Sequence, residues 1–390
     1  MADTVVQRPG MASSFLPSGR ALDYLFLILA ALASRAVFVI VGSLAIAMAD
    51  APVLGMGLHP WFELAHRFDS GWYINLIGNG YSAVESPVQP GATNFSFFPF
   101  YPLVVRAVMT LLDLHPLVAA VLVSNVAFLA ALILVYEYAR SAGLERGTAL
   151  VAAGLLCVTP QNFVFSVAYT EALFLALLAL AMLSIRREWW LVGGIAAAAL
   201  SATRSNGLFV ALFAAVHLWR THGPDVFLRP WRRPELLVIP ALAPLGLVLY
   251  WWFCFTATGD AFAQATTAGH GWGWVPRGIA DNLSAFIGSP EAHIRFWALS
   301  SLSFFAASLL LLRYRLYAEF AFCLACFLLY WTGNIPNSLT RYAMVLFPIY
   351  LGLALATRRH PAVLAGLAAV MAMVNGFLIV AWALQWPIAI

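Results

Sequence analysis

The sequence contains no lysine, because all 21 of its basic residues are arginine. A Walker-A nucleotide hydrolase, a pyridoxal enzyme and a retinal Schiff-base protein each need a lysine, so these classes are excluded. The D-x-D, H-E-x-x-H and G-x-G-x-x-G motifs are absent as well. Simple metal, nucleotide-sugar and dinucleotide sites therefore have no support in the sequence, and we expect neither a metal nor a cofactor.

Charged residues are scarce. They make up 10% of the 390 residues, whereas 63% are hydrophobic and the mean hydropathy is +0.86. A soluble globular chain carries about 25% charged and about 45–50% apolar residues. The composition therefore predicts an all-α, multi-pass integral membrane protein. The arginines are scattered between apolar runs, which excludes a nucleic-acid footprint and predicts no nucleic-acid partner.

The four cysteines do not indicate a metal or redox site. Cys157, Cys254, Cys323 and Cys326 all lie in apolar runs. Cys323 and Cys326 have C-x-x-C spacing, but no second pair or nearby histidine completes a metal or redox site. We interpret all four as small core residues.

Apolar runs dominate the chain. A spanning helix needs about 20 apolar residues and a broken one can be shorter, which gives about eleven segments. These segments are 21–48, 97–113, 116–139, 148–166, 168–185, 189–219, 235–256, 293–312, 317–331, 342–357 and 361–386. Two long connections, 49–96 and 257–292, interrupt them. Residues 1–20 are polar and no A-x-A-like cleavage site precedes the first run, so we expect a cytoplasmic tail and one membrane domain, 21–390.

The arginines predict the orientation. Basic connections face the cytoplasm, which places 220–233, 313–315 and 358–359 inside, together with the N-terminus. The acidic connection 49–96 then lies outside, and parity from Arg233 places 257–292 outside as well. One conflict stays open. Arg186 and Arg187 fall outside if 189–219 crosses once, and inside if this segment breaks at 204–207 and returns.

A polar motif follows the first apolar run, at Arg67-Phe-Asp69-Ser-Gly-Trp72-Tyr73. On a helix, Asp69 and Tyr73 share a face, and Trp72 is beside them. A carboxylate next to aromatic rings at the outer surface suits a general base with rings that hold a sugar. The alternative is an interfacial helix anchored by its aromatic residues, with Asp69 as a cap or in a pair with Arg67.

Charges inside the apolar runs form a second group of candidates. A charge at the bilayer centre costs about 2.5–3.5 kcal/mol, so it usually has a partner or a function. Glu171, in Tyr169-Thr-Glu171, opens an apolar run, either as a first-turn acid favoured by the helix dipole or as a ligand for an arginine or a substrate hydroxyl. Arg204 and Asn206 interrupt a long run before Gly207. Freed amides with an arginine suit a phosphate, and the alternative is a structural pair with Glu171.

Two further arginines belong to this group. Arg341, followed by Tyr342, lies in a short polar turn on the outer face. It is either a second phosphate ligand or an interfacial anchor of an ordinary turn. Arg35 lies deep in the first run, and we expect a carbonyl or carboxylate to neutralise it.

Together these motifs resemble the PIG-V-type (GPI mannosyltransferase 2-like) mannosyltransferases of the GT-C class. The matching stretches are 67–73 with Gly80-Tyr81, then 95–102, 169–174, 202–207, and Arg341-Tyr342 with Phe347-Pro348. They follow the family's order and cover most of the chain. The family pattern usually has tryptophan before the loop aspartate, where this chain has Phe68, but the carboxylate is retained.

The resemblance implies a GT-C-like bundle of about eleven transmembrane helices, with short interfacial helices in the large first outer loop. It also implies transfer of a sugar, usually mannose, from a polyprenyl phosphate to an acceptor hydroxyl on the extracytoplasmic face, with inversion. The arginine-only, alanine-rich chain looks bacterial. An inner-membrane enzyme with an envelope lipid, polysaccharide or protein acceptor is therefore expected.

The roles implied for single residues follow the motifs. Asp69 would be the catalytic base, and Arg204 and Arg341 would bind the donor phosphate. Residues that bind substrate or support the site would be Arg67, Trp72, Tyr73, Tyr169, Glu171, Asn206 and Tyr342. His270, Trp272 and Trp274 would cover the site, on a loop that Gly269, Gly271 and Gly273 make mobile.

Two other classes fit part of the pattern. A transporter or lipid flippase for a glycolipid or polyprenyl phosphate explains the many helices and the intramembrane charges equally well. It explains less well why both long connections lie on one face. A non-catalytic membrane subunit fits if Asp69 is dispensable.

Overall fold

The computed structural model describes residues 19–50 and 58–390. Within these ranges every regular element is an α-helix or a short 3-10 helix, which confirms the all-α prediction. The expected cytoplasmic tail lies outside the described residues except for its last two, and so do residues 51–57 of the first outer connection.

Helices occupy every predicted apolar segment. Four helical stretches are long and apolar enough to cross a bilayer, namely α1 (Gly19–Met48), α5 (Pro116–Ser141), Ala292–Arg313 and α20 (Pro361–Ala383). A fifth is the bent pair Pro234–Leu242 and α12 (Leu245–Thr258). The shorter apolar helices are α4 (Phe100–Leu112), α8 (Trp190–Ser201), α17 (Tyr317–Thr332) and α19 (Pro348–Thr357). Breaks therefore interrupt several runs, and length and composition alone do not fix eleven crossings.

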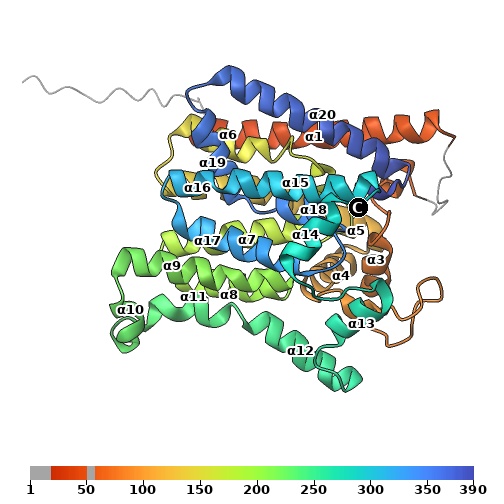
Figure 1. The fold of residues 1–390 in the computed structure, drawn as a ribbon, viewed down its shortest axis with the longest axis horizontal. Coiled ribbons are helices and arrows are strands. Elements are labelled where there is room, and N and C mark those ends of the chain that lie inside the picture. The colour runs from red at the N-terminus through yellow and green to blue at the C-terminus, as the bar shows by residue number, and fades with distance from the viewer. Residues whose placement is uncertain (1–18, 51–57) are drawn as a thin grey trace, which may run out of the picture.

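Most of these helices lie side by side with their axes along one direction (Figure 1). α1 and α20 form one edge of the bundle, and α12 lies at the opposite edge. α4 is seen nearly end-on, so it lies across the others rather than spanning with them. The short helices α3 (Ser70–Asn79), α13 (Ala263–Trp272) and α14 (Ile279–Ile287) gather at one end of the bundle. The two long connections therefore share an end, as the sequence predicts.

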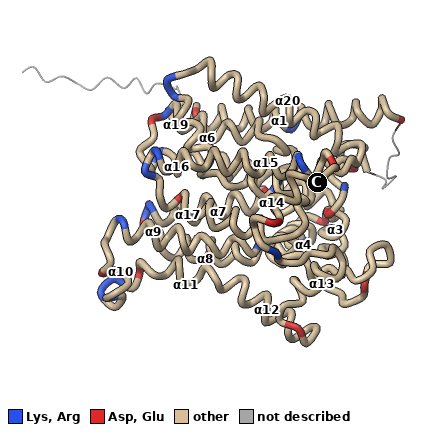
Figure 2. The backbone as a smooth tube through the Cα atoms, viewed as in Figure 1, with Lys and Arg blue, Asp and Glu red and all other residues tan. Residues whose placement is uncertain are grey.

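Arginines gather at the other end of the bundle, near α9 (Val210–His222), α16 (Leu310–Arg313) and α19 (Figure 2). Arg186 Nη2 lies 2.8 Å from Glu319 Oε1, and the Arg220 guanidinium lies 4.3 Å from the Tyr317 ring centroid. The ends of α7 (Glu171–Arg186) and α9 therefore meet the start of α17. We call this the arginine-rich end.

These contacts settle the open question about 189–219. The segment is a helical hairpin in which α8 leaves the arginine-rich end, the chain turns at residues 202–209, and α9 returns. Arg186 and Arg187 thus lie with the other arginines. The turn needs Gly207, because a Cβ there would lie 2.5 Å from the Leu200 carbonyl oxygen.

Two predictions about buried side chains are confirmed. All four cysteines are buried and unpaired with one another. Arg35 donates from Nη2 to the carbonyl and to the side-chain oxygen of Asn162, both at 3.1 Å. The expected carbonyl therefore accepts a hydrogen bond from this arginine, while its Nε and Nη1 have no hydrogen-bond partner among the described residues.

Candidate active site

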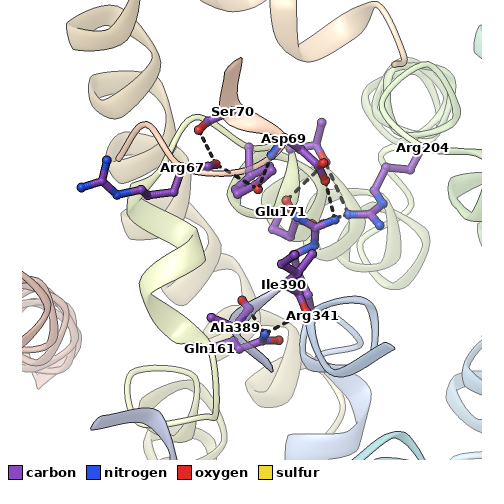
Figure 3. Close-up of polar contacts among 11 residues, drawn as sticks. Arg67, Asp69, Ser70, Gln161, Glu171, Arg204, Arg341, Ala389 and Ile390 are labelled. Atoms are coloured by element: carbon purple, nitrogen blue, oxygen red, sulfur yellow. Dashed lines mark hydrogen bonds and ion pairs between the residues drawn. The ribbon is translucent and has the colours of Figure 1, made fainter. Parts of the chain in front are cut away.

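Four segments that are distant in the sequence bring their charged side chains together (Figure 3). This place lies opposite the arginine-rich end. Asp69 directly precedes α3, Glu171 opens α7, Arg204 lies in the turn of the α8–α9 hairpin, and Arg341 lies in α18 (Leu339–Met344). We call these four residues the Asp69 cluster. Since Glu171 and Arg186 are the first and last residues of α7, the cluster and the arginine-rich end lie at opposite ends of one helix.

Glu171 is the centre of the cluster. Its side chain is 1% exposed, and Oε1 accepts a hydrogen bond from Arg204 Nη1 at 2.6 Å. Arg341 Nε lies 3.2 Å from the same oxygen, as an ion pair without hydrogen-bond alignment. The sequence left two interpretations of Glu171 open, and both are correct, because it occupies the first turn of α7 and holds two arginines.

Asp69 is the accessible carboxylate. Its side chain is 27% exposed, and Oδ2 accepts a hydrogen bond from Arg341 Nη2 at 3.1 Å. The Asp69 N–H donates to the Tyr169 hydroxyl at 3.0 Å, which fixes the backbone that carries the carboxylate. A substrate can therefore reach Asp69 but not Glu171.

The alternative pair between Asp69 and Arg67 is wrong. Arg67 is 3% exposed and its guanidinium points away from the cluster (Figure 3). Its carbonyl accepts hydrogen bonds from Ser70 Oγ at 2.5 Å and from the Tyr169 hydroxyl at 3.3 Å. Arg67 thus contributes to the loop around Asp69 through its backbone, while its side chain stays outside the cluster.

Aromatic rings flank both arginines of the cluster. The Arg341 guanidinium lies 4.6 Å from the Tyr169 centroid and 5.3 Å from the Tyr342 centroid. Arg204 lies 4.3 Å from the Tyr342 centroid, so this ring contacts both cations. Such cation–π contacts stabilise guanidinium groups that are largely removed from water. Nε and Nη1 of Arg341 are buried and have no hydrogen-bond partner within the described residues, so their N–H donors are unsatisfied.

Two further predicted residues, Tyr73 and Asn206, contact the tyrosines that surround the cluster. Tyr73 is buried, with its ring centroid 6.0 Å from that of Tyr169. Asn206 is also buried, and its amide donates to the Tyr330 hydroxyl at 2.7 Å. The Tyr330 ring centroid lies 5.5 Å from that of Tyr342. Asn206 therefore acts behind the cluster, through two tyrosines. The sequence missed Tyr330, which lies in an apolar run without a polar neighbour that could single it out.

Trp72 lies in the first turn of α3, three residues after Asp69. Its ring centroid lies 5.7 Å from that of Phe97 and 5.4 Å from that of Trp272 in α13. All three rings are half-buried, so they offer a partly open aromatic surface next to Asp69. Trp272 of the second long connection thus packs against Trp72 and Phe97 of the first, and its covering of the site stays a prediction.

The glycines around Trp272, which were predicted to make a loop mobile, lie in or next to a helix that packs closely on the first outer connection. Gly269 and Gly271 lie within α13, and a Cβ on Gly271 would lie 2.4 Å from Ala92 Cβ. Gln89 Nε2 donates to the Gly271 carbonyl at 2.9 Å, and Asn334 Nδ2 donates to the Gly273 carbonyl at 3.1 Å. Gly271 thus permits close packing of α13 on the first outer connection.

No set of three or more His, Cys, Asp or Glu side chains in residues 19–50 and 58–390 is placed to hold a metal ion. The charges that converge in the Asp69 cluster are two guanidinium groups and two carboxylates. Such a set suits the binding of an anion together with proton transfer at the accessible carboxylate.

Comparison with solved structures identifies proteins with a similar fold. No protein-family model and no curated protein matches the sequence. ArnT from Cupriavidus metallidurans bound to undecaprenyl phosphate is similar in structure, with a TM-score of 0.55 and 15% identity over 96% of this chain and 70% of ArnT. Its apo structure gives the same TM-score and identity over 93% of this chain and 64% of ArnT.

An archaeal oligosaccharyltransferase is more distant. AglB from Archaeoglobus fulgidus, in complex with an inhibitory peptide and a dolichol-phosphate, has a TM-score of 0.45 and 11% identity, and the match covers 90% of this chain. The chain spans 55% of the length of AglB, and a TM-score this low carries no argument. The likeness to ArnT shows that the chain shares the fold of this membrane protein.

Proposed function

We propose that this protein is an inverting glycosyltransferase of the PIG-V type. It transfers a sugar, which we propose is mannose, from a polyprenyl phosphate to an acceptor hydroxyl at the outer face of a bacterial inner membrane. One observation carries the proposal: a partly exposed Asp69 carboxylate lies 3.1 Å from a buried arginine that has a free donor, within a GT-C-like fold. The acceptor is an envelope lipid, polysaccharide or protein.

In the proposed reaction, the Asp69 carboxylate takes the proton of the acceptor hydroxyl while the hydroxyl oxygen attacks the anomeric carbon. The bond between that carbon and the phosphate oxygen breaks on the opposite face, so the configuration of the sugar inverts. The bonding electrons leave with the phosphate. Asp69 is suited to this role because it is the cluster's accessible carboxylate, whereas Glu171 is 1% exposed.

Arg341 and Arg204 would stabilise the departing phosphate, which is the larger electrostatic part of the work. The unpartnered Nη1 of Arg341 offers the first donor. Rings of Tyr169 and Tyr342 hold the guanidinium groups in place, and Glu171 supplies the opposite charge while the site is empty. A planar guanidinium fits a phosphate with two donors, which a lysine cannot do.

The donor class follows from the position of the cluster and from ArnT, which was solved with undecaprenyl phosphate. A prenyl chain gains about 0.8 kcal/mol per methylene buried in lipid, so such a donor presents its phosphate at the membrane surface. The Trp72, Phe97 and Trp272 rings offer a surface on which a sugar ring can stack.

One assay tests the proposal. Purified protein in liposomes receives radiolabelled polyprenyl-phosphate-mannose and a membrane-lipid extract, with the glucose-carrying donor as a matched substrate. We expect a labelled product with mannose, a weaker one with glucose, and none with Asp69→Asn. Translocation of the intact donor without product would instead indicate a flippase. Neither product nor translocation, with the protein bound to an active partner, would indicate a non-catalytic subunit.

A further inference from the structure

Two neighbouring cavities open at the arginine-rich end, at the far end of the bundle from the Asp69 cluster. Each has a volume of about 390 Å³. The first lies between the start of α6 (Arg146–Leu155), the end of α19 and the start of α20, and the second between α16 and the end of α19. Arg358 and Arg359 line both. We call the two cavities together the Arg358 site.

The arginines of the Arg358 site have no ion-pair partner among the described residues. Arg313, Arg358 and Arg359 are exposed, and none forms an ion pair within the part of the chain that the structure describes. Glu145 lines the first cavity but does not pair with them. Other arginines at the same end behave differently, because Arg146 pairs with Asp23, Arg186 with Glu319 and Arg187 with Glu137. Three uncompensated cations thus converge on one place.

The rest of the lining is mixed, because it also holds the polar side chains of Thr148, Thr357, Tyr314 and His360. We call its apolar side chains the apolar floor. Val151 and Leu364 contribute to the first cavity, and Leu310 and Leu355 to the second. α20, a helix of 23 residues, begins at Pro361 beside both cavities, and its free N-terminal amides favour an anion there. Exposed arginines next to apolar side chains at a membrane surface form a pattern that binds an anionic lipid headgroup. The volume lies within the range of about 300–1,000 Å³ typical of small-molecule sites.

We propose that the Arg358 site binds an anionic phospholipid of the surrounding leaflet. Its phosphate contacts Arg313, Arg358 and Arg359, and its acyl chains follow the apolar floor along Leu310 and Leu364 into the bilayer. The tendency of cytoplasmic connections to carry arginine explains the number of arginines at this end, but it explains neither the cavities nor the missing carboxylate partners. The apolar floor favours a lipid over free phosphate.

The test titrates the full-length protein, in micelles of a zwitterionic detergent, with three ligands: dioctanoyl phosphatidylglycerol, dioctanoyl phosphatidylcholine and inorganic phosphate. Native mass spectrometry measures the bound ligand. An arginine near a lipid surface contributes about fivefold in affinity, so Arg358→Gln with Arg359→Gln should weaken phosphatidylglycerol binding by about 25-fold. Arg229→Gln with Arg232→Gln removes the same charge at the same end outside the cavities and should change binding less than about twofold.

Each other result overturns the proposal. Equal loss in both double variants would show a general effect of the basic surface. Equal binding of inorganic phosphate would show an anion site without a lipid, and equal binding of phosphatidylcholine would show an apolar site without charge selection. Arg313→Gln gives a second, independent variant if the first pair reduces yield. The measurement needs no sugar transfer, so its failure is separate from failure of the proposed reaction.

Discussion

At the residue scale, exposure separates the two carboxylates of the Asp69 cluster. Asp69 is 27% exposed and contacts one arginine, whereas Glu171 is 1% exposed and contacts two. Burying an ion pair costs desolvation free energy. The attraction between the two charges offsets this cost only while both partners are present. The two side chains should therefore respond differently to the same isosteric change.

Asp69→Asn should leave the fold intact and reduce transfer by about 10²–10⁴-fold, because the amide keeps the shape and loses the base. Single-turnover rates with a lipid-linked donor measure the effect. Asp113→Asn is the matched control, since Asp113 is an exposed aspartate in the left-handed region, which asparagine tolerates. Wild-type turnover in a well-expressed Asp69→Asn protein would falsify the assignment.

Arg341→Lys should raise the donor KM by about 10- to 150-fold, the equivalent of one charge-assisted hydrogen bond of about 1.5–3 kcal/mol. The ammonium keeps the charge but loses the fork that reaches both Asp69 and a phosphate. Donor kinetics are compared with the melting temperature, and Arg277→Lys, an exposed arginine in an outer connection, is the control. Unchanged donor kinetics would leave Arg341 as a turn anchor.

His66, in the chain just before Asp69, should make the stability of the folded protein depend on pH. Burial lowers the pKa of His66 below its ordinary value of 6.5, and the positive charge of Arg67 lowers this pKa further. The folded protein therefore holds His66 neutral, while the unfolded chain binds a proton below pH 6.5, so stability falls as the pH falls through that value. The melting temperature should drop less between pH 7 and 5 in His66→Gln than in the wild type. Parallel pH profiles would contradict this.

At the element scale, the α8–α9 hairpin brings Arg204 to Glu171, and α18 brings Arg341 to the same oxygen. Loss of one partner of a buried pair costs about 3–5 kcal/mol. Glu171→Gln leaves Arg341 with Asp69 alone and Arg204 without a carboxylate, and should cost this much. Arg204→Gln should cost less, because Glu171 keeps Arg341.

The double variant, Glu171→Gln with Arg204→Gln, should recover most of the yield of folded protein. Monodisperse yield and transfer activity are measured together. Recovered yield without activity supports a phosphate ligand at Arg204, whereas recovered yield with full activity would reduce Arg204 to a structural partner. No recovery at all would show that the pair is not an independent unit.

Much of this element structure is readable from the sequence. Apolar runs locate the helices, and Gly207 beside Arg204 locates a break. The return of the chain at that break is not readable, because a run of apolar residues fits one crossing or two equally well. Likewise, the motifs name Asp69 and Arg341 separately. Only packing between segments that lie 272 residues apart shows that these two side chains pair.

At the scale of the whole molecule, the hairpin fixes which connections share a face. Single cysteines at Glu188 and Arg232 should react with a membrane-impermeant maleimide from one side, and a cysteine at Val88 from the other. Val88 is 90% exposed, and the four native cysteines are buried, so the background is low. Labelling of Glu188→Cys from the same side as Val88→Cys would restore a single crossing for 189–219.

The order in which the chain is synthesised follows from the Asp69 cluster. Glu171 and Arg204 are 33 residues apart and belong to adjacent helices, so they can enter the bilayer as a neutral unit. Arg341 emerges from the ribosome after both carboxylates are already in place, and α18 then completes the cluster. A nascent chain that stops before α18 holds Asp69 without its cation, and it has no means of binding a lipid phosphate at Arg341. If the proposed reaction is correct, the protein therefore stays inactive during its own biosynthesis until α18 has been inserted.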